Sequence, residues 1–252
     1  MDMQQVHERL LNLAIAFDEI CRGNGVEYTL HGGSLLGAIR EKGFIPWDDE
    51  MDIAMTRQEY NKLCLALKNN SRYYIAGSIK KQFRVTQDNS IWIDIFICDY
   101  ISEKPAAQKA KYFLLTVLDI MNRDKHTVGL SNLSQYSKSK QLLFKCCYLC
   151  GKILPGRVKA ALYEKVAIHC FTGSKKYFIR SNDHYQARQM LFPTAWMEVF
   201  AYVPFVTTKL PVTTQYHSLL LSIFGEDYMT PKKYDRNSEI HDIIRAEGDI
   251  TL

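Results

Sequence analysis

The sequence contains no hydrophobic run long enough to span a membrane. Its longest apolar stretch lies between Leu142 and Leu154 and is interrupted by Lys145 and Lys152. A helix needs about 20 mainly apolar residues to cross a bilayer. The opening residues, MDMQQ, carry neither a basic segment nor an apolar one. We therefore expect no transmembrane span, no secretory signal and a cytoplasmic location, with a peripheral position at the inner face of the membrane left open.

The cysteines have no regular spacing. There are seven of them, an odd number, and most lie in apolar stretches. This pattern favours reduced core thiols of an intracellular protein over a disulfide framework. Cys146, Cys147 and Cys150, together with Cys170, are residue types that bind zinc, but their helical context and apolar neighbours favour core thiols. There is also no internal repeat and no low-complexity tract, which excludes a solenoid.

Positive charge is concentrated in one segment. The chain has 252 residues, 47% hydrophobic and 23% charged, as expected of a globular protein with one large or two small domains. Its net charge is +5, yet ten Lys or Arg and a single acid, Glu164, lie between Lys138 and Arg180. Three interpretations remain: solvated helix faces, contact with an anionic membrane through an amphipathic helix at Leu142–Leu154, or binding of a phosphate-rich acceptor polymer. These lysines are not interleaved with stacking aromatics, so nucleic acid is the least favoured polyanion.

A glycine turn between a short strand and a helix predicts a phosphate-binding site. Residues 26–30 have strand character, and residues 35–40 have helical spacing. Between them, Gly32, Gly33 and Ser34 would bring backbone N–H groups and the positive end of the helix together. These three residues are predicted to bind phosphate, and the alternative is a tight turn with a helix cap.

Three acidic residues predict a divalent metal site. Glu50 and Asp52 lie two apart where a loop enters a strand, so their side chains share a face while Met51 and Ile53 point the other way. Asp94 is the single charge in the apolar segment 90–97, which has the pattern of a strand buried on both faces. A buried carboxylate needs a cation or several donors. Glu50, Asp52 and Asp94 are therefore predicted to bind Mg²⁺ or Mn²⁺, the alternative being surface or salt-bridged acids.

Neighbouring residues complete the predicted site. Asp48 has the position of a catalytic or metal-positioning acid or, alternatively, of a carboxylate that caps loop N–H groups, and Asp49 is a weaker candidate. Trp47 could stack on a nucleotide base or pack under the loop. The expected catalytic set is Asp48, Asp52 and Asp94, and the basic candidates for donor phosphate are Arg40, Lys42, Lys81 and Arg84. The sequence favours a structural role for His31 and leaves His241 as a candidate at the edge of the site.

The remaining pattern predicts an α/β (α+β) fold built on a mixed sheet. Helices are expected at 4–22, 57–67, 106–122, 139–153, 157–171 and 211–224, with strands at 72–76 and 81–86 that lead to the Asp94 strand. The Thr56–Glu59 spacing has the form of a capping box. We expect a catalytic core at 1–104, a basic helical insertion at 105–172, and a C-terminal part at 173–252 that completes the core and the rim of the site.

These motifs resemble those of a known family. The run HGGSLLGAIREKGFIPWDDEMDIAMTRQEY is similar to the signature of the LicD family, which includes bacterial phosphocholine transferases and is related to animal fukutin-type ribitol-phosphate transferases. WIDIF around Asp94 and the tail FGEDYM, followed by Pro231, are similar to its other recurring stretches. The resemblance extends from about residue 7 to about residue 241. It implies a nucleotidyltransferase-like core.

The resemblance also implies an activity. It points to transfer of a phosphocholine-like or polyol or sugar phosphate group from a CDP-linked donor, such as CDP-choline, to a glycan or lipid-linked glycan of lipopolysaccharide, teichoic acid or capsule. The family commonly has Asp where this chain has Glu50, which leaves the metal preference open. Two alternatives remain: a nucleotidyltransferase that attaches a nucleoside monophosphate to a small molecule or protein, and a non-catalytic nucleotide-binding regulatory domain.

Overall fold

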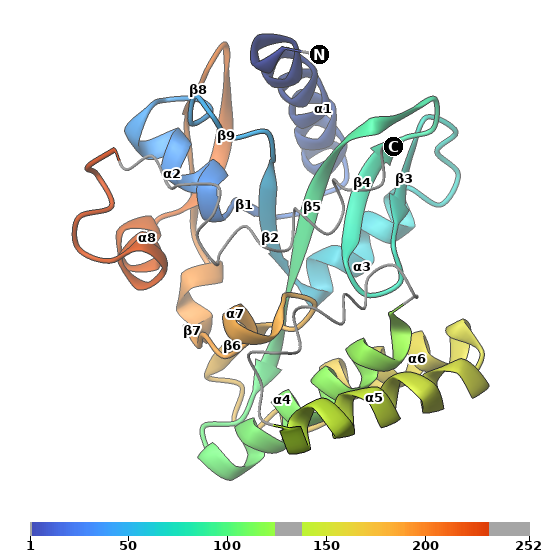
Figure 1. Cartoon of the computed structure of the whole chain (residues 1–252). Helices are drawn as coiled ribbons and strands as arrows, with labels where there is room; N and C mark the ends of the chain where they lie inside the picture. Colours follow the sequence, from blue (N-terminus) through green and yellow to red (C-terminus); the bar gives the residue numbers. More distant parts are fainter. Residues whose placement is uncertain (1, 124–137, 232–252) are drawn as a thin grey trace.

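The fold is organised around a mixed sheet. The computed structural model describes residues 2–123 and 138–231 (Figure 1). Within this part of the chain the sheet has seven strands: β1 (Thr29–Leu30), β2 (Asp52–Thr56), β3 (Tyr73–Ala76), β4 (Lys81–Val85), β5 (Asp88–Ile101), β6 (Tyr177–Arg180) and β7 (Phe192–Pro193). The order is β1-β2-β5-β4-β3, and β6 pairs with both β5 and β7. Strands β2 and β5 are parallel while the other pairs are antiparallel, which confirms the predicted mixed α+β fold.

The two faces of β5 differ in burial. Ile91, Ile93, Ile95 and Ile97 are buried, while Asp94, between them, is only partly buried. The expectation of a strand buried on both faces holds only toward the carboxyl end of β5, where Cys98 on the second face is also buried, whereas Asp94 lies on the more accessible part of that face. We call the buried side the core face, and the side that carries Asp52 and Asp94 the acid face.

Helices α1 (Met3–Gly23) and α3 (Arg57–Ala66) confirm two predicted helices. On the core face, Phe17 of α1 packs edge-on against Phe83 with ring centroids 4.9 Å apart. Thr56 caps α3 by accepting from the Glu59 N–H. The predicted capping box is only half formed, since the Glu59 carboxylate accepts from the Glu27 N–H at 2.9 Å instead.

Three helices form a layer beside the carboxyl end of β5, at the bottom of Figure 1: α4 (Pro105–Asn122), α5 (Lys138–Ile153) and α6 (Gly156–His169). Two buried lysines hold this layer together. Lys111 Nζ donates to the Tyr100 and Ala167 carbonyls, and Lys159 Nζ donates to the Met121 and Gly151 carbonyls. The helices were predicted, whereas the three-part division of domains stays a prediction.

The C-terminal region contains α7 (Tyr185–Arg188), the 3-10 helix η2 (Thr194–Met197), the hairpin β8 (Phe200–Phe205) and β9 (Thr208–Thr213), and α8 (Tyr216–Phe224). The predicted helix at 211–224 was wrong at its beginning. Pro211 and Val212 belong to β9, where they pair with Tyr202 and Ala201, and Val212 is fully buried. Helix α8 ends before Gly225, whose φ of +84° suits glycine.

Two exposed cysteines contradict the expectation of core thiols. Cys146 and Cys150 both lie exposed on α5. Separately, none of the helices within residues 2–123 and 138–231 is long and apolar enough to cross a lipid bilayer.

Candidate functional site

The parallel pairing of β2 and β5 brings two of the predicted metal ligands together. Asp52 and Asp94 are register partners, so their side chains lie side by side on the acid face. The pKa of the Asp52 carboxyl is raised well above its usual range by burial first, then by Asp94 and Glu50. Two neighbouring carboxylates therefore repel each other at a site where a cation would relieve the repulsion.

The predicted glycine turn fixes the position of Asp52. Its N–H donates to Ser34 Oγ at 2.9 Å, and its carbonyl accepts from the His31 N–H at 2.9 Å. Helix α2 (Gly32–Arg40) begins at this turn. A Cβ on Gly32 would lie 3.0 Å from Asp52 Oδ2, and one on Gly33 would lie 2.5 Å from Asp48 Oδ2. A side chain at either glycine would therefore press on a carboxylate, and Gly32, with φ of +52°, also has a backbone conformation that suits glycine. The turn lies at the N-terminal end of α2, where an anion is favoured.

The loop before β2 supplies further acids. Asp48 Oδ1 accepts from the Glu50 N–H at 3.4 Å, which is the geometry of a carboxylate that caps a loop N–H group. The Asp48 carbonyl lies 2.7 Å from His7 Nε2 of α1. Burial, then Asp94 and Asp48, raise the pKa of Glu50 to about 7. Asp49 is exposed. The charge of Asp94 therefore acts on Glu50, although the two residues lie on different elements.

The donor set fits a hard divalent cation in its chemistry, since all three candidate ligands are carboxylates. Burial and then the neighbouring acids raise the pKa values of Glu50 and Asp52. In the part of the chain that the structure describes, no three His, Cys, Asp or Glu side chains are already arranged to hold a metal ion. Asp52 and Asp94 are held on strands, whereas Glu50 comes from a loop. The metal-binding role of the three acids stays a prediction.

Basic side chains approach the acids from β4 and the turn before it. Gln82 pairs with Asp94 and Arg84 with Trp92, so Arg84 is on the acid face. Its guanidinium lies 4.3 Å from the Trp92 ring centroid and donates to Gln82. Lys80 was not among the predicted site residues. Its positive charge lowers the pKa of Glu50 and so partly offsets the effect of burial and the neighbouring acids.

Lys81, in contrast, pairs with the buried Ile95 and so points to the opposite face. Its ammonium donates to the Ser78 carbonyl at 2.7 Å and lies 3.4 Å from Glu164.

Three further predicted donor contacts lie at the end of α2 and in the loop that follows it. Arg40 is at the opposite end of α2 from Gly32, where its guanidinium donates to Glu41 and to the Tyr228 carbonyl. Lys42 is exposed in the following turn, with φ of +56°. Trp47 is partly buried and packs against the main core. The phosphate role of Arg40 and Lys42 and the base-stacking role of Trp47 stay predictions, and His241 lies outside the described residues.

A buried polar group beside the acids was missed by the sequence analysis. Arg180 at the end of β6 pairs with Asp183 at 3.1 Å and donates to His31 Nε2. Asp183 contributes to the raised pKa of Asp52. Burial and then Arg180 lower the pKa of His31 well below its usual range, so the ring is neutral. A signal did exist, since the polar run 180–184 directly follows an apolar strand.

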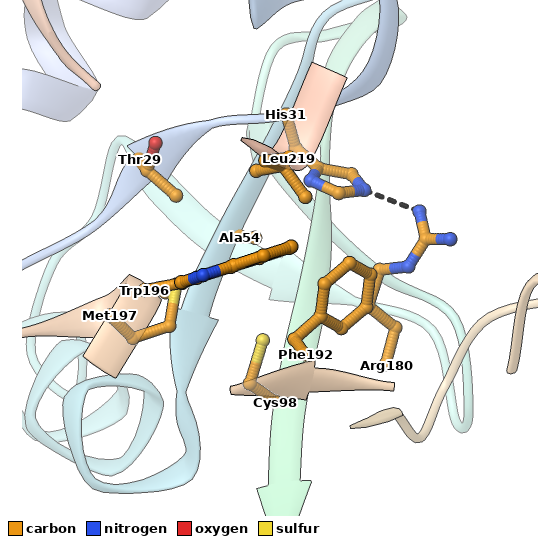
Figure 2. A pocket seen from close by; sticks show the side chains of 9 residues that line it. All are labelled: Thr29, His31, Ala54, Cys98, Arg180, Phe192, Trp196, Met197 and Leu219. Atoms are coloured by element: carbon orange, nitrogen blue, oxygen red, sulfur yellow. Dashed lines mark hydrogen bonds between the residues drawn. The ribbon is translucent and has the colours of Figure 1, made fainter. Parts of the chain in front are cut away.

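This group borders a small cavity on the acid face (Figure 2). The cavity, of about 10 Å³, is lined by Thr29, His31, Ala54, Cys98, Arg180, Phe192, Trp196, Met197 and Leu219. Its volume is at the lower limit for one water molecule and far below that of a nucleotide. Because Arg180 donates to Nε2, the neutral His31 ring carries its proton on Nδ1, an atom with no hydrogen-bond partner among the described residues.

Comparison with known proteins identifies a family domain in the part of the chain that contains the acids. Residues 25–148 match the family model described as LicD/FKTN/FKRP, nucleotidyltransferase domain, a range that contains the glycine turn and all the predicted acids but not Arg180. The chain is 50% identical over 52 residues to the lipopolysaccharide cholinephosphotransferase LicD of Haemophilus influenzae, a stretch covering 21% of this chain and 20% of that protein.

An uncharacterized protein of Rickettsia prowazekii is 29% identical over 108 residues, or 43% of this chain and 36% of that protein. An uncharacterized protein of Rickettsia typhi is 32% identical over 69 residues, or 23% of this chain and 22% of that protein. The matches therefore span between a fifth and about a third of the relatives' lengths. The chain carries a LicD family domain across residues 25–148.

Proposed function

We propose that this protein is a divalent-metal-dependent phosphotransferase. It moves a phosphocholine-like group from a CDP-linked donor to a hydroxyl of a cell-surface glycan. The observation that carries the proposal is the register pairing of Asp52 with Asp94 beside the Gly32–Gly33 turn. The LicD match and the printed activity of the Haemophilus relative support the choice of transferred group.

Each part of the site has a distinct role in this proposal. Asp52 and Asp94, joined by Glu50 from the loop, would hold Mg²⁺ or Mn²⁺. When bound, the cation supplies positive charge to the donor diphosphate and to the leaving nucleotide. The Gly32–Gly33 turn presents backbone N–H groups at the start of α2, where phosphate oxygens are favoured. Arg84, on the acid face, and Lys80, whose charge acts on Glu50, are the candidate basic contacts to the donor.

The reaction is an in-line displacement at phosphorus. An oxygen of the acceptor hydroxyl forms a new P–O bond, and the bond from that phosphorus to the bridging oxygen of the donor breaks, so that CMP leaves. The hydroxyl proton passes to a carboxylate. Asp48 is our candidate base, since its Oδ2 lies against the glycine turn, and Asp52 is the second.

Ligand stabilisation tests the donor and the metal together. Thermal unfolding of the full chain would be followed with CDP-choline, other CDP-linked alcohols or UDP-linked sugars, each with and without Mg²⁺ or Mn²⁺. A bound donor at a hundredfold excess over its Kd stabilises the fold by about 2.7 kcal/mol. We expect this stabilisation with a CDP-linked donor, and only when the divalent ion is present.

Product analysis separates this proposal from its alternatives. Mass spectrometry after incubation with the donor and a lipopolysaccharide acceptor should detect the glycan carrying the transferred phosphate group, together with CMP. Attachment of a nucleoside monophosphate to an acceptor would instead identify a nucleotidyltransferase. Donor binding without any product with lipopolysaccharide, teichoic acid or capsular acceptors would favour a regulatory domain.

A further inference from the structure

Helix α5 presents an apolar stripe to solvent. Leu142, Leu149 and Ile153 are 65%, 63% and 83% exposed, and Cys146 lies on the same line. At 100° per residue these positions cluster on one side of the helix. Such a row costs solubility unless it has a partner, because exposed apolar side chains on monomers are normally scattered.

The orientation of this stripe is fixed by the opposite side of α5. Gly151 is buried, and a Cβ there would lie 2.3 Å from the Met121 carbonyl oxygen of α4. Its own carbonyl accepts from Lys159 of α6 at 2.9 Å. Since Gly151 is half a turn away from Leu142 around the helix, the packed side and the apolar stripe face opposite directions.

Lysines border the stripe along its whole length. Lys138, Lys145 and Lys152 are exposed and recur every seven residues along one edge of the stripe. Beyond the turn after α5, Val158 and Leu162 of α6 are also exposed, at 44% and 41%. The outer surface of this layer therefore combines aliphatic side chains with a row of positive charge.

We propose that this surface, Leu142, Leu149 and Ile153 with Lys138, Lys145 and Lys152, docks the protein onto an anionic lipid bilayer. The helix lies in the plane of the headgroups, with its aliphatic side chains in the acyl boundary and its lysines beside lipid phosphates. The chemistry distinguishes a bilayer from a protein partner. Protein interfaces are depleted in Lys and enriched in Trp, Tyr and Arg at their centres, whereas this surface has a row of Lys beside Leu and Ile.

Vesicle sedimentation tests the proposal with the full chain and needs neither donor nor acceptor, so its outcome is independent of the proposed function. Binding to phosphatidylcholine–phosphatidylglycerol vesicles should exceed binding to pure phosphatidylcholine vesicles and fall with added salt. The triple variant K138Q/K145Q/K152Q should bind about a hundredfold more weakly, at about fivefold for each lysine near the surface. The matched control K68Q/K176Q/K209Q removes three exposed lysines elsewhere and should bind like the parent.

The apolar half of the surface needs its own variant. L142S/L149S/I153S changes only exposed positions, so its circular dichroism should match the parent while its vesicle binding is lost. Equal binding to neutral and anionic vesicles, or equal losses in the control and lysine triples, would overturn the proposal. A dimer in sedimentation velocity that the apolar variant abolishes would also overturn the proposal. The same holds if soluble polyphosphate binds at the lysines while the apolar variant binds vesicles like the parent.

Discussion

Asp52 and Asp94 are 42 positions apart in the chain but face each other as register partners on two parallel strands. Because directly paired residues on neighbouring strands point to the same side of a sheet, the two carboxylates share one face. The pair is adjacent before any ligand binds, and the repulsion between its members is a cost in the free protein that a cation removes.

Replacing either member of this pair should separate activity from stability. We expect Asp52→Asn and Asp94→Asn each to lower transfer at least about a hundredfold, because a charged ligand is lost at the reacting diphosphate. Without divalent ions, both variants should unfold at a temperature equal to or above that of the parent, since the repulsion is relieved. Transfer assays and thermal unfolding measure the two effects. Asp49→Asn, at an exposed acid in the loop before β2, serves as the control. Near-parental transfer by Asp94→Asn would refute the metal-ligand assignment.

Gly33 should be intolerant of a methyl group. In Gly33→Ala the new Cβ would lie 2.5 Å from Asp48 Oδ2, so the carboxylate or the turn must move. A displacement of about 1 Å in such a site costs on the order of a hundredfold in rate, and we expect a loss of that size in steady-state transfer. Gly156→Ala meets no atom within 4 Å at the start of α6 and should leave the rate unchanged. Equal rates for the two variants would show that the glycine turn is only structural.

The two basic residues of β4 should differ in their effect on the donor. Arg84 is on the acid face and Lys81 on the opposite one. Arg84→Gln removes a charge-assisted contact to phosphate, and we expect the KM for the donor to rise about tenfold. Lys81→Gln should leave the KM unchanged, although it loses the contact with Glu164. Kinetics at varied donor concentration compare the two variants. A rise in KM for Lys81→Gln alone would contradict donor binding on the acid face.

Asp183 should make the fold acid-sensitive. Burial alone would raise its pKa, but Arg180 and then His184 outweigh burial and lower the pKa to about 2. A depressed folded-state pKa gives stability that is fully present above the unfolded value, near 3.8, and is lost as the pH falls towards 2. The stabilisation is about 2 kcal/mol above pH 5.

Urea unfolding of Asp183→Asn measures this contribution. The variant should be less stable than the parent at pH 7, and the difference should shrink between about pH 5 and pH 2. A constant difference across this range would mean that the carboxylate charge is not what stabilises the fold. Glu226→Gln, at an exposed acid beyond α8, should show no such dependence.

Local patterns predicted most of the elements because they depend on neighbours in the chain. Helical spacing located α1, α3, α4, α5 and α6, and the strands before Asp94 were placed to within about two residues. Residues 208–213 were not predicted as a strand, since Pro211 and Val212 take that form only by pairing with β8. The sequence left open whether the apolar residues of α5 face the core or the surface, because an exposed apolar stripe has the same spacing as a buried helix face.

The sequence alone determined which chemical groups are available and in what local geometry. It set the glycine turn before a helix, the closely spaced acids Glu50 and Asp52 at the start of a strand, and the single acid in an apolar strand. Tertiary structure decided which of these groups meet. The register of β2 against β5 placed Asp94 beside Asp52, and β6 carried Arg180 to His31. Pairing between distant strands is selected by the packing of the whole core, which no local stretch of sequence encodes.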